Sequence, residues 1–236
     1  MRLGGIDAII FDLGNTLVPF GDREIRILYE ALERVFAREL GPMESFFDRA
    51  NSARDSMMRE REDGSMREIT VEEFAHEVSG GRATPRLLDG VREVMHRTFL
   101  DACRVPDGLH GLLRHLAEGR KLAVCSNYLL TSPIEELLQD AGLWDLFVTV
   151  EVSATSGFMK PHAVPFERVR SRLGVPAART LMVGDNFFAD IVGGCRAGFK
   201  TALTREHLPA NDFDARAPDV RADFVVSSLD ELADRS

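Results

Sequence analysis

Six short apolar runs, each bounded by turn residues, constrain the fold of this chain more than any other feature. The runs cover residues 6–12, 121–126, 146–150, 180–184, 199–203 and 223–226. Continuous apolar runs of this length are typical of strands that are buried on both faces of a parallel sheet. Helical stretches separate the later runs, at residues 108–118, 132–141, 163–173 and 188–197. This alternation predicts an α/β fold with a doubly wound, Rossmann-like parallel sheet.

Residues 20–104 show a different pattern, because no convincing strand run occurs in them. Apolar residues instead recur at helical spacing along residues 24–40, and a similar stripe indicates a helix from about Pro85 to Leu100. The charged stretch at residues 57–68 is interpreted as a solvated face or a connection. The chain is therefore expected to combine an α/β core with an all-helical block inserted after the first strand.

The insertion leaves the predicted sheet directly after Asp12. Ligands of open α/β sheets bind outside the carboxyl ends of the strands, so a helical block at that edge is expected to cover the binding site. We therefore expect an α/β core made of residues 1–19 and 105–236 and a helical cap made of residues 20–104. A length of 236 residues suits one domain with a sizeable insertion.

Charge and cysteine content narrow the class of protein. The formal net charge is -9 and the pI is about 5.2, which disfavours contact with nucleic acid or with an anionic membrane surface. The spacing of Cys103, Cys125 and Cys195 matches neither a zinc pattern nor a disulfide framework, and we expect buried thiols. The N-terminal apolar run includes Asp7 and is too short for a signal peptide or a membrane span. These features predict a cytoplasmic protein.

Polar side chains follow the predicted strands in four stretches. They read FDLGNTL from residue 11, VCSN from residue 124, KP from residue 160 and GDNFFAD from residue 184. Each stretch alone has a structural explanation, such as a turn, a helix cap or a surface lysine. Together they are expected to gather a set of charged and polar side chains at one edge of the sheet. The set is Asp12, Ser126, Lys160, Asp185 and Asp190.

The residue types in this set suit phosphoryl transfer. Carboxylates are ligands for a hard cation such as Mg²⁺. A lysine and a serine hydroxyl are able to hold phosphate oxygens and to offset the charge of the transition state. A carboxylate is also able to act as a nucleophile and to form an acyl phosphate. The set therefore favours a metal-dependent reaction on a phosphorylated ligand.

In this order the four stretches resemble the motifs of the haloacid dehalogenase-like (HAD) hydrolase superfamily. The resemblance runs from Asp12 to beyond Asp190, and the helical block resembles the cap of the helical-cap (C1) branch. It implies an enzyme, a hydrolase that uses Mg²⁺. Within the phosphatase-like branch it implies a small phosphorylated metabolite as substrate, bound by a monomer or a homodimer.

The resemblance also implies a role for each residue. Asp12 is the nucleophile that forms an aspartyl-phosphate. Asp12 and Asp185 bind Mg²⁺ together with the backbone carbonyl of Gly14. Asp190 orients Lys160 or the water shell of the metal. The residues that hold the transferred phosphoryl group are Ser126, Asn127 and Lys160.

Gly14 departs from the family pattern, since phosphatases of this family usually carry an aspartate there that protonates the leaving oxygen. Three explanations stay open. The chain is a phosphatase that works without this acid, a dehalogenase-like enzyme whose halide needs no proton, or a weakly active or non-catalytic phosphate-binding relative that acts through a partner. Phosphonate-cleaving relatives also lack the acid, but they use a cap lysine, and residues 20–104 contain no lysine.

Two residues near the motifs are candidates to replace the missing acid, namely Asp22 and His162. The arginines of the expected cap offer cations for an anionic substrate, although most arginines are surface residues. The candidates are Arg23, Arg26 and Arg54. No motif in the cap identifies the substrate itself.

Overall fold

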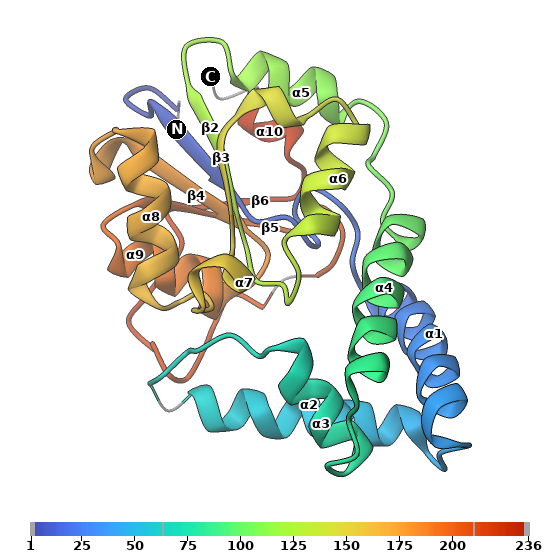
Figure 1. Ribbon diagram of the computed structural model, residues 1–236. Coiled ribbons are helices and arrows are strands. Elements are labelled where there is room, and N and C mark those ends of the chain that lie inside the picture. Colours follow the sequence, from blue (N-terminus) through green and yellow to red (C-terminus); the bar gives the residue numbers. More distant parts are fainter. Residues whose placement is uncertain (1–2, 63, 210, 234–236) are drawn as a thin grey trace.

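The computed structural model describes residues 3–62, 64–209 and 211–233. Within these residues six strands form one sheet in the order β3-β2-β1-β4-β5-β6, and every neighbouring pair is parallel (Figure 1). The strands are β1 (Ala8–Phe11), β2 (Lys121–Ser126), β3 (Phe147–Val152), β4 (Thr180–Gly184), β5 (Lys200–Thr204) and β6 (Phe224–Val226). The predicted parallel α/β fold is confirmed.

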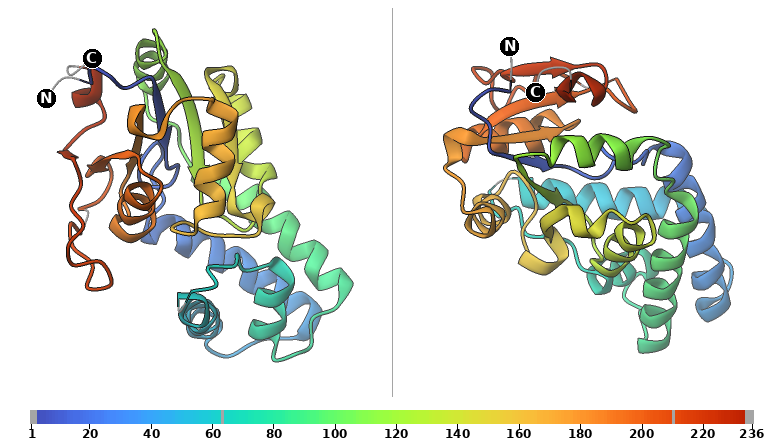
Figure 2. Two further views of the ribbon diagram at one scale, coloured as in Figure 1. Left: turned by 90° about the vertical axis from the view of Figure 1, so that its left-hand side faces the viewer. Right: turned by 90° about the horizontal axis from the view of Figure 1, so that it is seen from above.

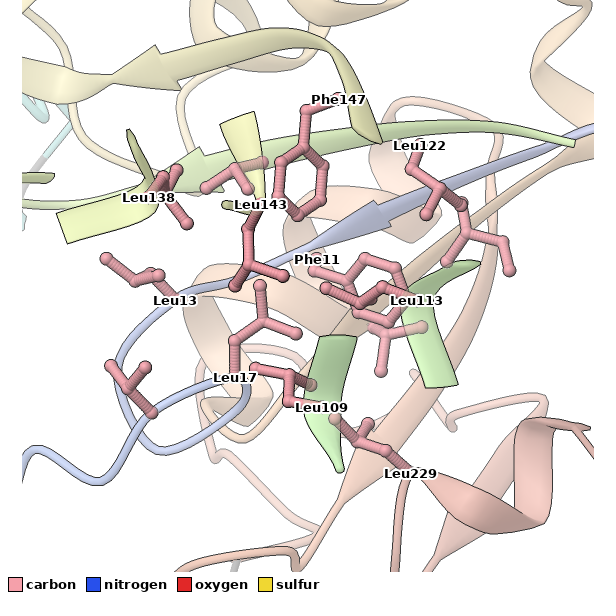
Figure 3. Packing of buried hydrophobic residues seen from close by; sticks show 14 of the residues in the cluster. Phe11, Leu13, Leu17, Leu109, Leu113, Leu122, Leu138, Leu143, Phe147 and Leu229 are labelled. Atoms are coloured by element: carbon pink, nitrogen blue, oxygen red, sulfur yellow. The ribbon is translucent and has the colours of Figure 1, made fainter. Parts of the chain in front are cut away.

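Helices cover both faces of the sheet, which explains why the strands are apolar throughout. Ile9 and Phe11 of β1 pack with residues of α5 and α6, whereas Ala8 and Ile10 face α8 on the other side. Figure 3 shows Phe11 among leucines that include Leu113 of α5. The helices of this part are α5 (Leu109–Leu116), α6 (Ser132–Asp140), α7 (Ser153–Ser156), α8 (Ala163–Leu173), α9 (Gly193–Arg196) and α10 (Asp230–Ala233), with 3₁₀ turns at Trp144–Leu146 and Ala177–Arg179.

Four helices lie between β1 and β2 and form a separate layer at one end of the molecule (Figures 1 and 2). They are α1 (Asp22–Leu40), α2 (Phe46–Glu62), α3 (Val71–Ser79) and α4 (Pro85–Ala102). Their apolar stripes meet in a hydrophobic cluster of their own. The predicted helical insertion after the first strand is confirmed. The division at residues 20 and 104 stays a prediction, and residues 1–2 and 234–236 of the predicted core lie outside the described residues.

Two details differ from the sequence expectations. The charged stretch at 57–68 was expected to be a solvated face or a connection; its first part is the end of α2, which reaches Glu62, and Met57 in it is buried in the cap cluster. Residue 63 lies outside the described residues. The cysteines are free thiols, but Cys195 is only half-buried, whereas the other two are buried as expected. None of the described helices combines the length and apolarity needed to cross a membrane.

Candidate active site

The carboxyl ends of β1, β2 and β4 lie side by side and open into a cavity of about 380 Å³. Asp12 follows β1 directly, and its backbone N–H donates to the carbonyl of Val183 in β4 at 2.9 Å. Ser126 ends β2, and Asp185 follows β4. The structure brings the seven residues to which the resemblance assigns a role to the wall of this cavity, namely Asp12, Gly14, Ser126, Asn127, Lys160, Asp185 and Asp190.

Lys160 lies at the centre of a buried charge cluster. Its ammonium group donates to Asp12 Oδ1 at 2.7 Å, to Asp190 Oδ1 at 2.6 Å and to the carbonyl of Cys125 at 2.6 Å. Burial acts to lower the pKa of Lys160, but the carboxylates of Asp12 and Asp190 outweigh it and hold that pKa above its ordinary value. The lysine is therefore charged and holds the Asp12 carboxylate in place.

A third carboxyl group, that of Asp185, lies beside the two that Lys160 contacts. Ligand oxygens of Asp12, Asp185 and Asp190 lie within 4.8 Å of one another. Burial, with repulsion from the other two carboxylates, raises the pKa of Asp185 to about 8. Burial also raises the pKa of Asp190 to about 6, although Lys160 acts against it. The raised pKa values reflect burial and the mutual repulsion of three close carboxyl groups, and their hard oxygen donors fit a divalent cation such as Mg²⁺, which would relieve that repulsion.

The position of Asp190 depends on an unusual helix and on a glycine. Asp190 lies in a π-helix, Phe187–Val192, and its Oδ2 accepts from the backbone N–H of Asn186 at 3.0 Å. A Cβ placed on Gly184 would lie 2.2 Å from the same carboxylate oxygen. Only glycine therefore fits at the end of β4 without moving Asp190. Gly184, Asn186 and the carbonyl of Cys125 were not predicted from the sequence as parts of this site.

Replacing Gly184 with alanine is expected to reduce kcat by about 10²-fold, because displacement of Asp190 releases Lys160 from its geometry. Overpacking should also lower the free energy of unfolding by about 1–3 kcal/mol. Steady-state kinetics and urea unfolding measure the two effects. Gly111→Ala is the matched control, since an added Cβ there meets nothing within 4 Å and α5 gains helix propensity. Equal changes in kcat and in the free energy of unfolding for Gly184→Ala and Gly111→Ala would contradict a role of Gly184 in placing Asp190.

Asn127 holds the backbone of Lys160. Its Nδ2 donates to the carbonyl of Lys160 at 3.1 Å, and its Oδ1 accepts from the N–H of Lys160 at 2.8 Å. Both ends of the amide are thus engaged with the chain segment that presents the lysine. A direct contact of Asn127 with phosphate, expected from the sequence, stays a prediction.

The loop after Asp12 places Phe20 beside Gly14. Gly14 forms a β-bridge with Val18, and the Asn15 side chain bonds both the N–H and the carbonyl of Phe20, at 2.8 and 3.0 Å. A Cβ on Gly14 would lie 3.4 Å from the Cβ of Phe20, and the φ angle of Gly14 is not in the left-handed region. A side chain at position 14 would therefore be in van der Waals contact with Phe20.

The structure separates the two candidates for the missing acid. His162 caps α8, accepting from the N–H of Val164 at 3.2 Å, stacks on Phe158, and lines a different cavity. Asp22, at the start of α1, lines the cavity that contains Asp12 and Lys160, which we call the catalytic cavity. Of the cap arginines named as candidates, Arg54 lies in the wall of the catalytic cavity. Arg23 instead forms an ion pair with its neighbour Glu24.

Fold and site together define a hydrolase with an α/β core, a helical insertion and a carboxylate-rich centre. The chain belongs to the haloacid dehalogenase-like hydrolase family, whose model matches residues 6–198. It is 29% identical to the ribulose-1,5-bisphosphate 5-phosphatase of Halopiger xanaduensis, over 96% of this chain and 98% of that protein.

Solved structures share the fold. The HAD hydrolase YfnB from Bacillus subtilis, crystallised with magnesium, superimposes with a TM-score of 0.69 at 23% identity and covers 96% of each chain. The 2-haloacid dehalogenase from Pseudomonas syringae pv. Tomato DC3000 gives a TM-score of 0.73 at 22% identity, over 98% of this chain and 97% of that one. At this identity the likeness concerns the fold alone.

Proposed function

We propose that this chain is a Mg²⁺-dependent phosphatase that acts on a small phosphorylated molecule through an aspartyl-phosphate on Asp12. The observation that carries the proposal is the charge cluster in which Lys160 holds Asp12, while Asp185 and Asp190 supply further carboxylates. Whole-length similarity to a sugar-bisphosphate phosphatase supports the phosphorylated substrate.

The proposed reaction assigns one task to each side chain. A carboxylate oxygen of Asp12 attacks phosphorus, the bond to the leaving oxygen breaks, and water then cleaves the acyl phosphate and regenerates Asp12. Lys160 orients Asp12 and supplies positive charge beside the phosphoryl group. Ser126 offers its hydroxyl to a phosphoryl oxygen. Mg²⁺ would be held by Asp12, Asp185 and the carbonyl of Gly14, and when bound it offsets the charge of the transferred group.

Millimolar Mg²⁺ is expected to bind the protein, and Asp185→Asn is expected to weaken this binding at least tenfold, because a neutral amide replaces a charged ligand. Isothermal titration calorimetry measures both affinities. Asp22→Asn is the matched control, since Asp22 lines the same cavity outside the carboxylate cluster. Unchanged binding by Asp185→Asn would remove Asp185 from the metal site.

The proposed chemistry predicts Mg²⁺-dependent hydrolysis of phosphomonoesters, which EDTA abolishes. Asp12→Asn should lose all measurable turnover, because an amide is too weak a nucleophile. Acid quenching followed by peptide mass spectrometry should detect the phosphoryl group on the Asp12 peptide of the wild-type protein and not of the variant. Phosphorylation of another residue, or full activity of Asp12→Asn, would contradict the proposal.

Gly14 favours one second candidate, a dehalogenase-like hydrolase of carbon–halogen bonds, because a halide leaves without a proton. The carboxylate cluster of Asp12, Asp185 and Asp190 weighs against it, since dehalogenase relatives do not need Mg²⁺. Release of halide from 2-haloacids in the presence of EDTA, without phosphatase activity, would select this candidate. Binding of phosphate without turnover of either substrate class would select a non-catalytic relative.

A further inference from the structure

A second cavity, of about 290 Å³, lies between the cap helices and the core and shares part of its wall with the catalytic cavity. We call it the cap chamber. The residues common to both walls are Phe20, Ile25, Arg54, Asn127, Tyr128 and Asn186. The catalytic cavity and the cap chamber are therefore adjacent, and a group attached to a phosphate in the catalytic cavity would lie within reach of the chamber.

The cap chamber is lined mainly by apolar side chains, and each of the four cap helices contributes. The contributors include Leu28 and Leu32 of α1, Met58 of α2, Phe74 of α3 and Met95 of α4. Such a wall offers burial of apolar surface and few hydrogen-bond partners, which suits a hydrocarbon or aromatic group better than a polyol.

Polar groups at the chamber are few, and Glu68, Asn127 and Asn186 already have hydrogen-bond partners in the chain. Glu68 is buried, accepts from the N–H of Ile69 at 2.8 Å and bonds to the hydroxyl of Ser153. Among the described residues that line the chamber, Arg54 is the basic one, and it stands in the wall shared with the catalytic cavity. A second phosphate deep in the chamber would therefore lack cations to neutralise it.

Phe20 extends the apolar surface to the leaving-group side of the catalytic cavity. Its ring packs against those of Phe99 and Tyr128, with centroid distances of 5.8 and 6.1 Å, and its Cβ lies 3.4 Å from the position that a Cβ on Gly14 would take. The position at which related phosphatases carry a proton donor is thus a glycine, and an apolar side chain, that of Phe20, lies beside it. This arrangement favours a leaving group that is apolar and needs no proton.

Given the proposed phosphatase function, on which this inference rests, we propose that the substrate is a phosphate ester or anhydride whose leaving group is apolar, about the size of a substituted benzene ring, and stable as an anion. The cap chamber binds that group. Its volume supports the size, because a buried cavity of about 150 Å³ already holds benzene. Aryl phosphates are the simplest compounds of this class.

A series of aryl phosphates tests the chamber at nearly constant leaving-group acidity. From phenyl to para-ethylphenyl to para-butylphenyl phosphate, kcat/KM is expected to rise by up to about fourfold for each methylene that is buried, until the chamber is full. Ribose 5-phosphate and ribulose 1,5-bisphosphate should be poor substrates. The matching arylphosphonates, which are not hydrolysed, should bind with the same trend in calorimetry.

Met58→Trp should abolish the rise of kcat/KM along the aryl phosphates and the rise of affinity along the arylphosphonates, because the indole fills the chamber from α2. Leu88→Trp is the matched control, since Leu88, like Met58, is partly buried against the cap cluster but does not line the cap chamber or the catalytic cavity. A flat series in the wild-type protein, with phenyl phosphate hydrolysed, overturns the inference and leaves the phosphatase proposal standing. A rising phosphonate series without hydrolysis of any ester overturns the phosphatase proposal and supports the chamber.

Discussion

Gly14→Asp is expected to raise turnover of alkyl phosphates by about 10²–10⁴-fold, the range that general acids supply, while changing turnover of aryl phosphates much less. An alkoxide leaves poorly without a proton, whereas a phenolate needs little help. The backbone tolerates the change, because the φ angle of Gly14 is outside the left-handed region and the new Cβ would meet Phe20 at 3.4 Å. Stopped assays of phosphate release with matched alkyl and aryl esters measure the two rates.

Gly14→Asn is the control for this substitution, since asparagine has the same size as aspartate but donates no proton to the leaving oxygen. Its turnover of alkyl phosphates should stay at the level of the wild-type protein. If the wild-type protein already hydrolyses alkyl phosphates at about 10 s⁻¹, an ordinary enzymatic rate, another residue supplies the proton. Asp22 then becomes the first residue to replace, because it lines the catalytic cavity and His162 lines another.

Lys160→Met is expected to reduce kcat by at least about 10²–10³-fold, because a preorganised charge at the phosphoryl site is lost. It should also lower the free energy of unfolding by about 3–5 kcal/mol, since removal of one partner leaves buried charges unpaired. Asp12 and Asp190, 2.7 and 2.6 Å from the ammonium group, lose their cation. Kinetics with Mg²⁺ and urea unfolding with EDTA measure the two effects separately.

Lys200→Met is the matched control, because Lys200 also pairs with an aspartate, Asp223, at 2.8 Å, but nearly half of its side chain is exposed. Exposed ion pairs contribute little to stability, so this variant should resemble the wild-type protein in both measurements. If Lys160→Met kept the stability and the activity of the control, the buried cluster would not organise the site.

The local sequence predicted the elements of the core well. The helix expected at 163–173 is α8, with the same bounds, and the strands expected at 121–126 and 180–184 are β2 and β4. Strands buried on both faces leave a continuous apolar run, and a helix leaves a periodic stripe, so both are visible in one segment at a time. The prediction of one helix at 188–197 was less accurate, because residues Phe187–Val192, which include Asp190, form a π-helix and only the following residues form α9.

The sequence by itself also predicted which residues would lie together, because the carboxyl ends of parallel strands meet at one edge of the sheet, and the structure places these residues around one cavity. Only the tertiary structure decided how these residues contact one another. Lys160 donates a hydrogen bond to Asp12, 148 positions away in the sequence. Asn127 forms a hydrogen bond with the backbone of that lysine, and Phe20 lies beside Gly14. Likewise, the cap chamber exists because side chains from four separate helices face the core together. Such contacts depend on packing between distant segments, and no spacing within one segment encodes them.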